Sequence, residues 1–384
     1  MPMLPSFPPV QFDFGAIDTL PAALAERGVM RPLVITDSGL TEHGIVARVL
    51  AAFPSGAEVA VFDGIPPNPT IAGIDAALDV YKARDCDGIV GLGGGSVLDS
   101  GKALRVAATH PGPIVDYLKD PSKITAAVAP YITVPTTSGT GAEVTFGGGI
   151  HTEPGAYQLG IRSPHVKPDL AICDPGLTLT LPPVLTAATG MDAFSHCVEG
   201  YLSNIVNAPA EAIALDGIAR VMRFVERATA DGSDREARSE MMMAALQGGF
   251  AIYMGLGPIH TLGHIFANSP LHHGALITAS APAVMQFYAA ASADGSTDGT
   301  NDGLAAKLAQ LRDAMGLKPG ANIAKAISDL NTRLGLSNSV RALGYPETDP
   351  DVLAGLAMEV HFNATAPRAP TRAEYRDIIA AALA

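Results

Sequence analysis

The stretch GLGGGSVLDSGKAL (residues 91–104) lies where a predicted buried strand gives way to a predicted helix. Glycines in such a turn let the backbone approach a diphosphate, and the free N–H groups at the helix start attract its charge. Two familiar templates do not match. The dinucleotide fingerprint GxGxxG needs glycine at Ser96 or Leu98, and the P-loop needs a hydroxyl residue at Ala103. The glycine-rich stretch is therefore compatible with two interpretations, a phosphate-binding turn and tight packing of the strand against the helix.

Further apolar, β-branched runs flank this turn within the first 180 or so residues. RPLVITDSG, EVAVFDG and YITVPTT are typical of buried strands, and segments such as TIAGIDAALDVYKA between them have apolar residues at helical spacing. The alternation predicts a parallel α/β sheet covered by helices. Ligands of such sheets bind at the carboxyl ends of the strands, so the loops after these runs are the first places to search.

The second half of the chain has a different pattern. From about Leu185 the strand signals end, and helical windows rich in Ala, Leu and Met follow, among them ALDGIARVMRFVERAT. We therefore expect an α/β domain over residues 1–182 and an all-helical domain over residues 183–384. The small, polar and acidic stretch 291–302 predicts a solvated loop.

Composition and charge exclude several classes of partner. The chain has 384 residues, 48% of them hydrophobic, and a net charge of −13 with no basic stripe for nucleic acid or anionic lipid. Its three cysteines, Cys86, Cys173 and Cys197, are scattered and show no CxxC spacing, which favours a reducing cytoplasm over a disulfide framework. The start lacks a signal-peptide pattern, and no run of about 18 apolar residues offers a membrane span.

A second loop strengthens the case for a nucleotide site. PTTSGTGAEVT (135–145) also follows a predicted strand and is dense in hydroxyls and glycines, so two such loops favour a nucleotide cleft over coincidence. Asp37 ends the strand RPLVITD, where a carboxylate can accept hydrogen bonds from the ribose of an adenosine and repel a 2′-phosphate. A helix-capping aspartate before SGLTEHG explains Asp37 equally well.

Two segments of the helical half place acidic and imidazole side chains at helical spacing. MDAFSHCVEGY carries Asp192 and His196 four residues apart, which puts both on one helix face within a turn. IHTLGHIFANSPLHHG (259–274) carries four of the chain's ten histidines, and the first two, His260 and His264, are again four apart. Unrelated core histidines are the alternative, but the repeated spacing on two segments favours one metal site.

Taken together, these motifs resemble those of the iron-containing, group III alcohol dehydrogenases along most of the chain. The likeness is carried by GIPPNPT (64–70), GGGSVLDSGKA (93–103), PTTSGTGAEVT (135–145), DPGLTLTLPP (174–183), GMDAFSHCVEGY (190–201) and HTLGHIFANSPLHHG (260–274). The resemblance implies a Rossmann-like dinucleotide-binding domain followed by a helical metal-binding domain, an architecture shared with dehydroquinate synthase.

The resemblance also assigns roles to individual residues. It implies metal ligands at Asp192, His196, His260 and His273, and a substrate-side histidine at His264. It implies NAD contacts at Asp37, Asn68, Gly94, Gly95, Ser96, Thr136, Thr137 and Thr140.

Three departures from the family pattern bear on these assignments. The loop between the ligand histidines is one residue short, so His272 competes with His273 as the last ligand. Gln158 replaces a lysine that touches the cofactor in many members, and Gly147 replaces an asparagine. The run Gly147 to Gly149 indicates either a roomier pocket wall or a flexible loop away from the site.

The implied activity is a reversible, metal-dependent NAD(H)-linked alcohol dehydrogenase that interconverts a small alcohol and its carbonyl compound by hydride transfer. The expected metal is Fe²⁺, although imidazole and carboxylate ligands also suit Zn²⁺ and other divalent ions. The metal acts as a Lewis acid, and His264 relays the hydroxyl proton. We expect a homodimer or higher homo-oligomer in the cytoplasm, with a small alcohol or aldehyde as the substrate.

The same motifs argue against three alternative functions. A maleylacetate reductase-like oxidoreductase typically lacks a complete metal set, and the presence of Asp192 argues against it. A dehydroquinate synthase-like lyase needs basic residues for a phosphate-bearing substrate, and residues 255–274 contain no Lys or Arg. A non-catalytic scaffold has no reason to combine four metal ligands with two nucleotide loops.

Overall fold

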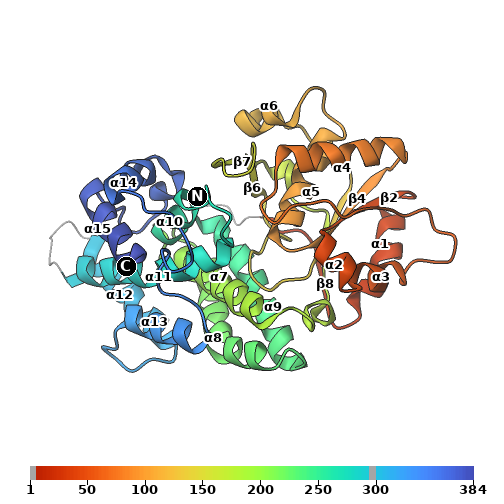
Figure 1. The fold of residues 1–384 in the computed structure, drawn as a ribbon. Coiled ribbons are helices and arrows are strands. Elements are labelled where there is room, and N and C mark those ends of the chain that lie inside the picture. Colours follow the sequence, from red (N-terminus) through yellow and green to blue (C-terminus); the bar gives the residue numbers. More distant parts are fainter. Residues whose placement is uncertain (1–5, 294–299) are drawn as a thin grey trace. The chain divides into compact units, whose positions relative to one another are not determined.

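The computed structural model describes residues 6–293 and 300–384, which form two compact units (Figure 1). The α/β unit comprises Ser6–Thr137 and Gly141–Thr180. The helical unit comprises Leu181–Ala384 together with the short segment Ser138–Thr140. The chain therefore passes from one unit to the other between Thr180 and Leu181, and the threonine-rich loop contributes three residues to the helical unit.

A six-stranded sheet, parallel in every pair, forms the centre of the α/β unit in the order β1-β8-β5-β4-β2-β3. Its strands are β1 (Val10–Phe12), β2 (Pro32–Ile35), β3 (Ala60–Phe62), β4 (Gly88–Gly93), β5 (Tyr131–Pro135) and β8 (Leu170–Cys173), and a separate antiparallel hairpin is formed by β6 (Gly147–His151) and β7 (Gln158–Arg162). From β2 the chain goes to β3 on one side and then crosses to β4 on the other. In parallel sheets such a reversal marks the crevice where ligands bind.

Helices cover both faces of this sheet because its strands are apolar on both sides. Leu33 and Ile35 of β2 belong to one buried cluster, while Val34 between them belongs to another, as the alternation of side chains along a strand requires. The first face is covered by α4, α5 and α6, the second by α1 and α3. The helices of this unit are α1 (Leu20–Glu26), α2 (Ser38–Glu42), α3 (Ile45–Leu50), α4 (Ile71–Ala83), α5 (Gly95–Ala107) and α6 (Ile114–Lys119).

The hairpin β6–β7 packs directly against α5. Lys102 of α5 is fully buried, and its ammonium group lies 2.9 Å from Asp99 and 2.7 Å from the carbonyl oxygen of Gly147. A Cβ atom at Gly148 would clash with the Asp99 side chain. The glycine run is thus a strand in close contact with a helix, and neither the roomier pocket wall nor the flexible loop holds at Gly148.

The helical unit is built around α7, twenty residues that are buried along almost their whole length. It packs against α8, α9 and α11, and these helices share one large apolar core. The helices are α7 (Pro183–Leu202), α8 (Ala208–Ala230), α9 (Arg235–Ala251), α10 (Pro258–Ile265), α11 (His273–Ala293), α12 (Thr300–Ala314), α13 (Ile323–Arg333), α14 (Pro350–Glu359) and α15 (Arg372–Leu383). A buried α7 gives this unit a rigid element on which a site can be held.

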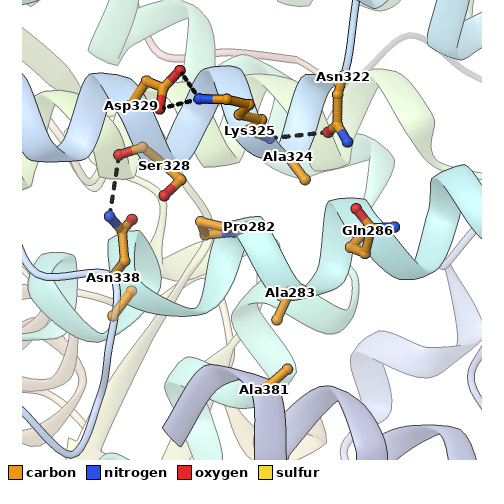
Figure 2. Close-up of a pocket in the computed structure, with 11 residues that line it drawn as sticks. Pro282, Ala283, Gln286, Asn322, Ala324, Lys325, Ser328, Asp329, Asn338 and Ala381 are labelled. Atoms are coloured by element: carbon orange, nitrogen blue, oxygen red, sulfur yellow. Dashed lines mark hydrogen bonds and ion pairs between the residues drawn. The ribbon is translucent and has the colours of Figure 1, made fainter. Parts of the chain in front are cut away.

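A proline interrupts the hydrogen bonding of α11 beside a surface pocket of about 400 Å³. Pro282 has no N–H to donate to the Thr278 carbonyl, and the Asn331 amide of α13 donates to that oxygen instead, at 3.1 Å. Figure 2 shows Pro282 facing α13 across the pocket, where Lys325 is paired with Asp329. Lys325 and Asp329 are paired, Asn338 donates to the Ser328 carbonyl, and none of the expected site residues lines the pocket.

The expected fold class is confirmed, and the differences concern short elements. The runs RPLVITDSG, EVAVFDG and YITVPTT contain β2, β3 and β5, and the strand predicted before the glycine-rich turn is β4. The strands β1 and β8 and the hairpin were not predicted; β6 begins with three glycines, a residue type that is depleted in strands. Of the expected loop 291–302, its two ends belong to α11 and α12, and residues 294–299 lie outside the described residues.

The described residues contain no single helix that is long and apolar enough to cross a membrane. One bent pair, Arg235–Met254 with Pro258–Ile265, meets that test by length and composition only.

Candidate metal and cofactor sites

Helix α7 presents a line of polar side chains within its buried surface. Asp192, His196 and Glu199 follow one another at spacings of four and three residues, which places them on one face of the helix. All three are buried, with at most 5% of each residue exposed. A backbone hydrogen bond with Gly139, in the segment Ser138–Thr140, contributes to the pKa of His196. Uncompensated polar groups at this depth are costly, so the arrangement calls for partners.

Two more histidines approach Asp192 from α10 and from the start of α11. The Nε2 atoms of His260 and His273 lie 3.7 Å and 3.8 Å from the Asp192 Oδ1 atom. One ligand atom from each of these three residues lies within 4.8 Å of the others. His196 lies beside them, with its ring stacked 4.5 Å from that of His260 and its Nδ1 atom 3.9 Å from Asp192 Oδ2.

A glycine determines how closely α11 approaches α7. A Cβ atom at Gly274 would lie 2.7 Å from the carbonyl oxygen of Ala188, one turn before Asp192 on α7. Because Gly274 allows this contact, the residue before it, His273, reaches the Asp192 carboxylate. His272 is exposed, and its carbonyl oxygen accepts hydrogen bonds from Ala275 and Leu276 at the start of the helix. The structure therefore brings His273 rather than His272 to the cluster.

The donor atoms of this cluster fit a divalent metal. Among the described residues, Asp192 Oδ1, His196 Nδ1 and His260 Nε2 are buried and have no hydrogen-bond partner. Each unsatisfied buried group costs about 1–3 kcal/mol, and a cation held between Asp192 and His260 would satisfy two of them. His196 lies outside the group whose ligand atoms are all within 4.8 Å of one another. One carboxylate and several imidazoles suit Fe²⁺, Zn²⁺ and similar ions.

The protonation states of the cluster also favour a cation. Burial lowers the pKa of His196 and of His273 to about 4, which leaves both imidazoles neutral and able to bind metal at pH 7. Burial raises the pKa of Asp192, but the neighbouring histidines, His196 first, outweigh it and hold that pKa below its ordinary value. Burial lowers the pKa of His260, and contacts with Asp192 and Glu199 reverse this and raise it to about 9. A divalent metal bound through His260 Nε2 at neutral pH would therefore displace a proton from that imidazole.

His264 lies one helical turn beyond His260 on α10 and is half-buried. It is not part of the three-residue cluster. Its ring centroid lies 6.3 Å from that of Phe362, and the Phe362 ring lies at the same distance from His260. One aromatic ring thus packs edge-on against both histidines and restricts where they point.

The sequence analysis missed two residues of this site, Glu199 and Phe362. The Glu199 carboxylate accepts a hydrogen bond from His260 Nδ1 at 2.5 Å. Its position seven residues after Asp192 was the available signal, because that spacing returns to the same helix face. Phe362 lies about a hundred residues from His260, and nothing local in the sequence indicates the contact.

In the α/β unit, the glycine-rich turn joins β4 to α5 and gathers most of the expected cofactor residues. Gly94 is the N-cap of α5 and has no side-chain cap, so the first N–H groups of the helix are available to a ligand. The Thr136 N–H donates to the Gly93 carbonyl at 3.1 Å, and a Cβ atom at Gly94 would touch the Thr137 side chain. The Ser96 hydroxyl donates to the Pro67 carbonyl, which holds the loop carrying Asn68 against this turn.

Asp37 and Thr140 lie at the edges of this arrangement. Asp37 follows β2, the neighbour of β4, and its carboxylate accepts a hydrogen bond from the Leu40 N–H at 3.1 Å as the N-cap of α2. Asp37 therefore caps α2 with one carboxylate oxygen, and the other oxygen could still accept a hydrogen bond from a ribose. Thr140 lies in the segment Ser138–Thr140, which belongs to the helical unit.

A parallel sheet with an uncapped glycine-rich turn, together with a buried carboxylate–imidazole cluster on helices, defines a metal-dependent, dinucleotide-linked oxidoreductase. The family model described as iron-containing alcohol dehydrogenase matches residues 8–175, and its C-terminal counterpart matches residues 186–383. The chain belongs to the iron-containing alcohol dehydrogenase family.

Individual relatives agree with this assignment. The chain is 42% identical to 4-hydroxybutyrate dehydrogenase from Cupriavidus necator, over 96% of this chain and 97% of the relative. It is 30% identical to NAD-dependent methanol dehydrogenase from Bacillus methanolicus, over 96% of each. Among solved structures, a 1,3-propanediol oxidoreductase aligns over 100% of both chains with a TM-score of 0.90 and 30% identity. The protein is thus an alcohol oxidoreductase of the iron-containing family, whose members use NAD(H) and a divalent metal.

Proposed function

We propose that this enzyme interconverts a small primary alcohol and its aldehyde at a metal held by Asp192, His196, His260 and His273. The single observation that carries the proposal is the cluster of Asp192, His260 and His273 on α7, α10 and α11, in which Asp192 Oδ1 and His260 Nε2 are buried without a hydrogen-bond partner. The cofactor half of the proposal assigns NAD to the turn between β4 and α5. Its support is the uncapped start of α5 beside two threonines and the loop that carries Asn68.

The chemistry divides between the bound groups and the chain. When bound, the divalent metal supplies Lewis acidity toward the substrate oxygen, and NAD supplies the hydride acceptor. Asp192 compensates part of the cation's charge, and the neutral imidazoles of His196 and His273 provide lone pairs without adding charge. His264, one turn from His260 and held by Phe362, exchanges the hydroxyl proton of the substrate with solvent.

For the substrate, we propose an ω-hydroxy acid, with 4-hydroxybutyrate first. The support is the relative of that name, which is 42% identical over nearly the whole chain, against 30% for the methanol dehydrogenase. A pocket built for a carboxylate discriminates against an uncharged alcohol of the same length, since a hydrogen bond to a charged group contributes about 1.5–3 kcal/mol.

Purified, iron-loaded enzyme tests this function through NADH formation with 4-hydroxybutyrate, 1-butanol, 1,3-propanediol and methanol. We expect kcat/KM for 4-hydroxybutyrate to exceed that for 1-butanol by about 10- to 100-fold, the factor that 1.5–3 kcal/mol corresponds to. Equal kcat/KM values for 4-hydroxybutyrate and 1-butanol would contradict the proposed substrate class but not the alcohol dehydrogenase activity. No NADH from any alcohol, and no NADH oxidation with the matching aldehydes, would refute the proposed function.

The role of Asp37 is tested through cofactor choice. We expect wild-type enzyme to use NADP at least about tenfold less efficiently than NAD, because a 2′-phosphate beside a carboxylate near the surface is repelled by up to about 4 kcal/mol. Asp37→Asn removes the charge but keeps a good helix cap. This variant is expected to narrow the preference for NAD over NADP with little change in melting temperature. The control, Glu42→Gln, removes another negative charge of α2 and is expected to leave this cofactor preference unchanged. If wild-type enzyme uses NAD and NADP with equal efficiency, Asp37 acts only as a helix cap.

Location and assembly belong to the same proposal. We place the enzyme in the cytoplasm, which the three free, buried cysteines support. With a net charge of −13, neither nucleic acid nor an anionic membrane is a favoured partner. A homodimer or higher homo-oligomer stays a prediction.

A further inference from the structure

Glu199 connects two of the helices that carry metal ligands. It lies on α7, seven residues after Asp192, and only 2% of its side chain is exposed. Its Oε2 atom accepts a hydrogen bond from His260 Nδ1 at 2.5 Å, and its Oε1 atom accepts one from the Ile259 backbone N–H at 2.6 Å. A single carboxylate thus holds both the first turn of α10 and the ring of its metal-ligand histidine.

The charge of this buried carboxylate is compensated in an unusual way. Among the residues that the structure describes, His260 is the one basic side chain within ion-pair distance of it. The remaining compensation comes from the N-terminus of α10, where the N-cap, Gly257, has no side-chain cap of its own. Glu199 therefore caps α10 from another helix. Its two oxygens bind the Ile259 backbone N–H and the His260 ring, which belong to neighbouring residues of α10.

The bond to Nδ1 determines which nitrogen of His260 is available. A carboxylate can only accept, so the proton of the neutral imidazole stays on Nδ1 and the Nε2 lone pair is left free. That Nε2 atom lies 3.7 Å from Asp192 Oδ1 and has no hydrogen-bond partner. We infer that Glu199 is a positioning residue that fixes the tautomer and orientation of His260 for metal binding. This inference rests on the metal site of the proposed function.

Glu199→Gln tests the inference, because glutamine keeps the size of the side chain but presents an NH₂ group to one of the donors. We expect the metal-stripped variant to bind Co²⁺ 10- to 100-fold more weakly than wild type in competition with a chelator, the range typical of lost partners of metal-ligand histidines. The visible spectrum of the Co²⁺-saturated variant is expected to shift as the His260 ring moves. Glu199→Asp keeps the negative charge, so this variant is expected to recover part of the wild-type Co²⁺ affinity and part of the wild-type spectrum.

Asn207→Ala is the matched control, because Asn207 is the buried N-cap of α8 in the same unit and accepts from the Ala210 N–H. It removes a cap of about 1 kcal/mol and should leave Co²⁺ affinity and spectrum unchanged. If Glu199→Gln binds Co²⁺ as tightly as wild type with the same spectrum, Glu199 is not a positioning residue. Equal weakening by Asn207→Ala would also overturn the inference, since any lost cap would then suffice. Failure of wild type itself to bind Co²⁺ would instead overturn the metal site.

Discussion

His273→Ala is expected to empty the metal site and lower kcat/KM by about 10³-fold or more while the protein stays folded. The Nε2 atom of His273 lies 3.8 Å from Asp192 Oδ1, and the variant removes one of the few donors that face this carboxylate. Loss of Lewis acidity forfeits several kcal/mol of stabilisation of the transition state, and each 1.4 kcal/mol is tenfold in rate. Elemental analysis and NADH formation on the same sample measure both effects, and His260→Ala should behave alike.

His272→Ala is the control for this result. His272 is the adjacent histidine, but it is exposed, and the hydrogen bonds that it accepts from Ala275 and Leu276 go to its backbone carbonyl, which alanine retains. We therefore expect metal content and turnover close to those of wild type. If His272→Ala empties the site and His273→Ala does not, the short loop before Gly274 is placed wrongly by one residue.

His264→Ala is expected to keep the metal and lose turnover. A positioned acid–base group typically contributes 10²–10⁴-fold to the rate, and we expect kcat to fall within that range, with a changed pH dependence and unchanged NAD affinity. The residue lies outside the three-residue cluster, so metal content should stay close to that of wild type. Steady-state kinetics across pH, combined with elemental analysis, make the measurement.

His361→Ala serves as the matched variant for His264. His361 also packs its ring against Phe362, with centroids 4.3 Å apart, but it is exposed. Removing it takes one imidazole from the same aromatic neighbour without touching the expected proton path, so turnover should change little. If His264→Ala loses the metal, His264 is a metal ligand. If its turnover is unchanged, His264 does not transfer the substrate proton.

The sequence predicted the fold class because its periodicity is strong where the elements are long or buried. The four quoted strands are apolar runs of the buried sheet, and α8 and α9 give helical windows of more than a dozen residues. The spacing of Asp192 from His196, and of His260 from His264, indicated helix faces because one turn of helix is about 3.6 residues. These features are local, and local patterns are what a single sequence displays.

What the sequence did not predict depends on contacts between distant segments. His272 and His273 are adjacent, and the distance across to α7, 3.8 Å from His273 Nε2 to Asp192 Oδ1, distinguishes them. The role of Glu199 depends on the start of α10, sixty residues away, lying against it. The run Gly147 to Gly149 left a roomier pocket wall and a flexible loop both open, whereas Asp99 occupies the position that a side chain at Gly148 would take.

Titration of metal-stripped enzyme with Fe²⁺ under anaerobic conditions tests the central claim most directly, with NADH formation from the best alcohol substrate followed at each step. The claim is that one divalent ion per chain, bound at Asp192 and the three histidines, is required for turnover. Activity is then expected to be near zero in the stripped protein, to rise in proportion to added Fe²⁺ and to stop rising at one equivalent per chain. Full activity in the stripped protein, or a rise without saturation near one equivalent, would contradict it.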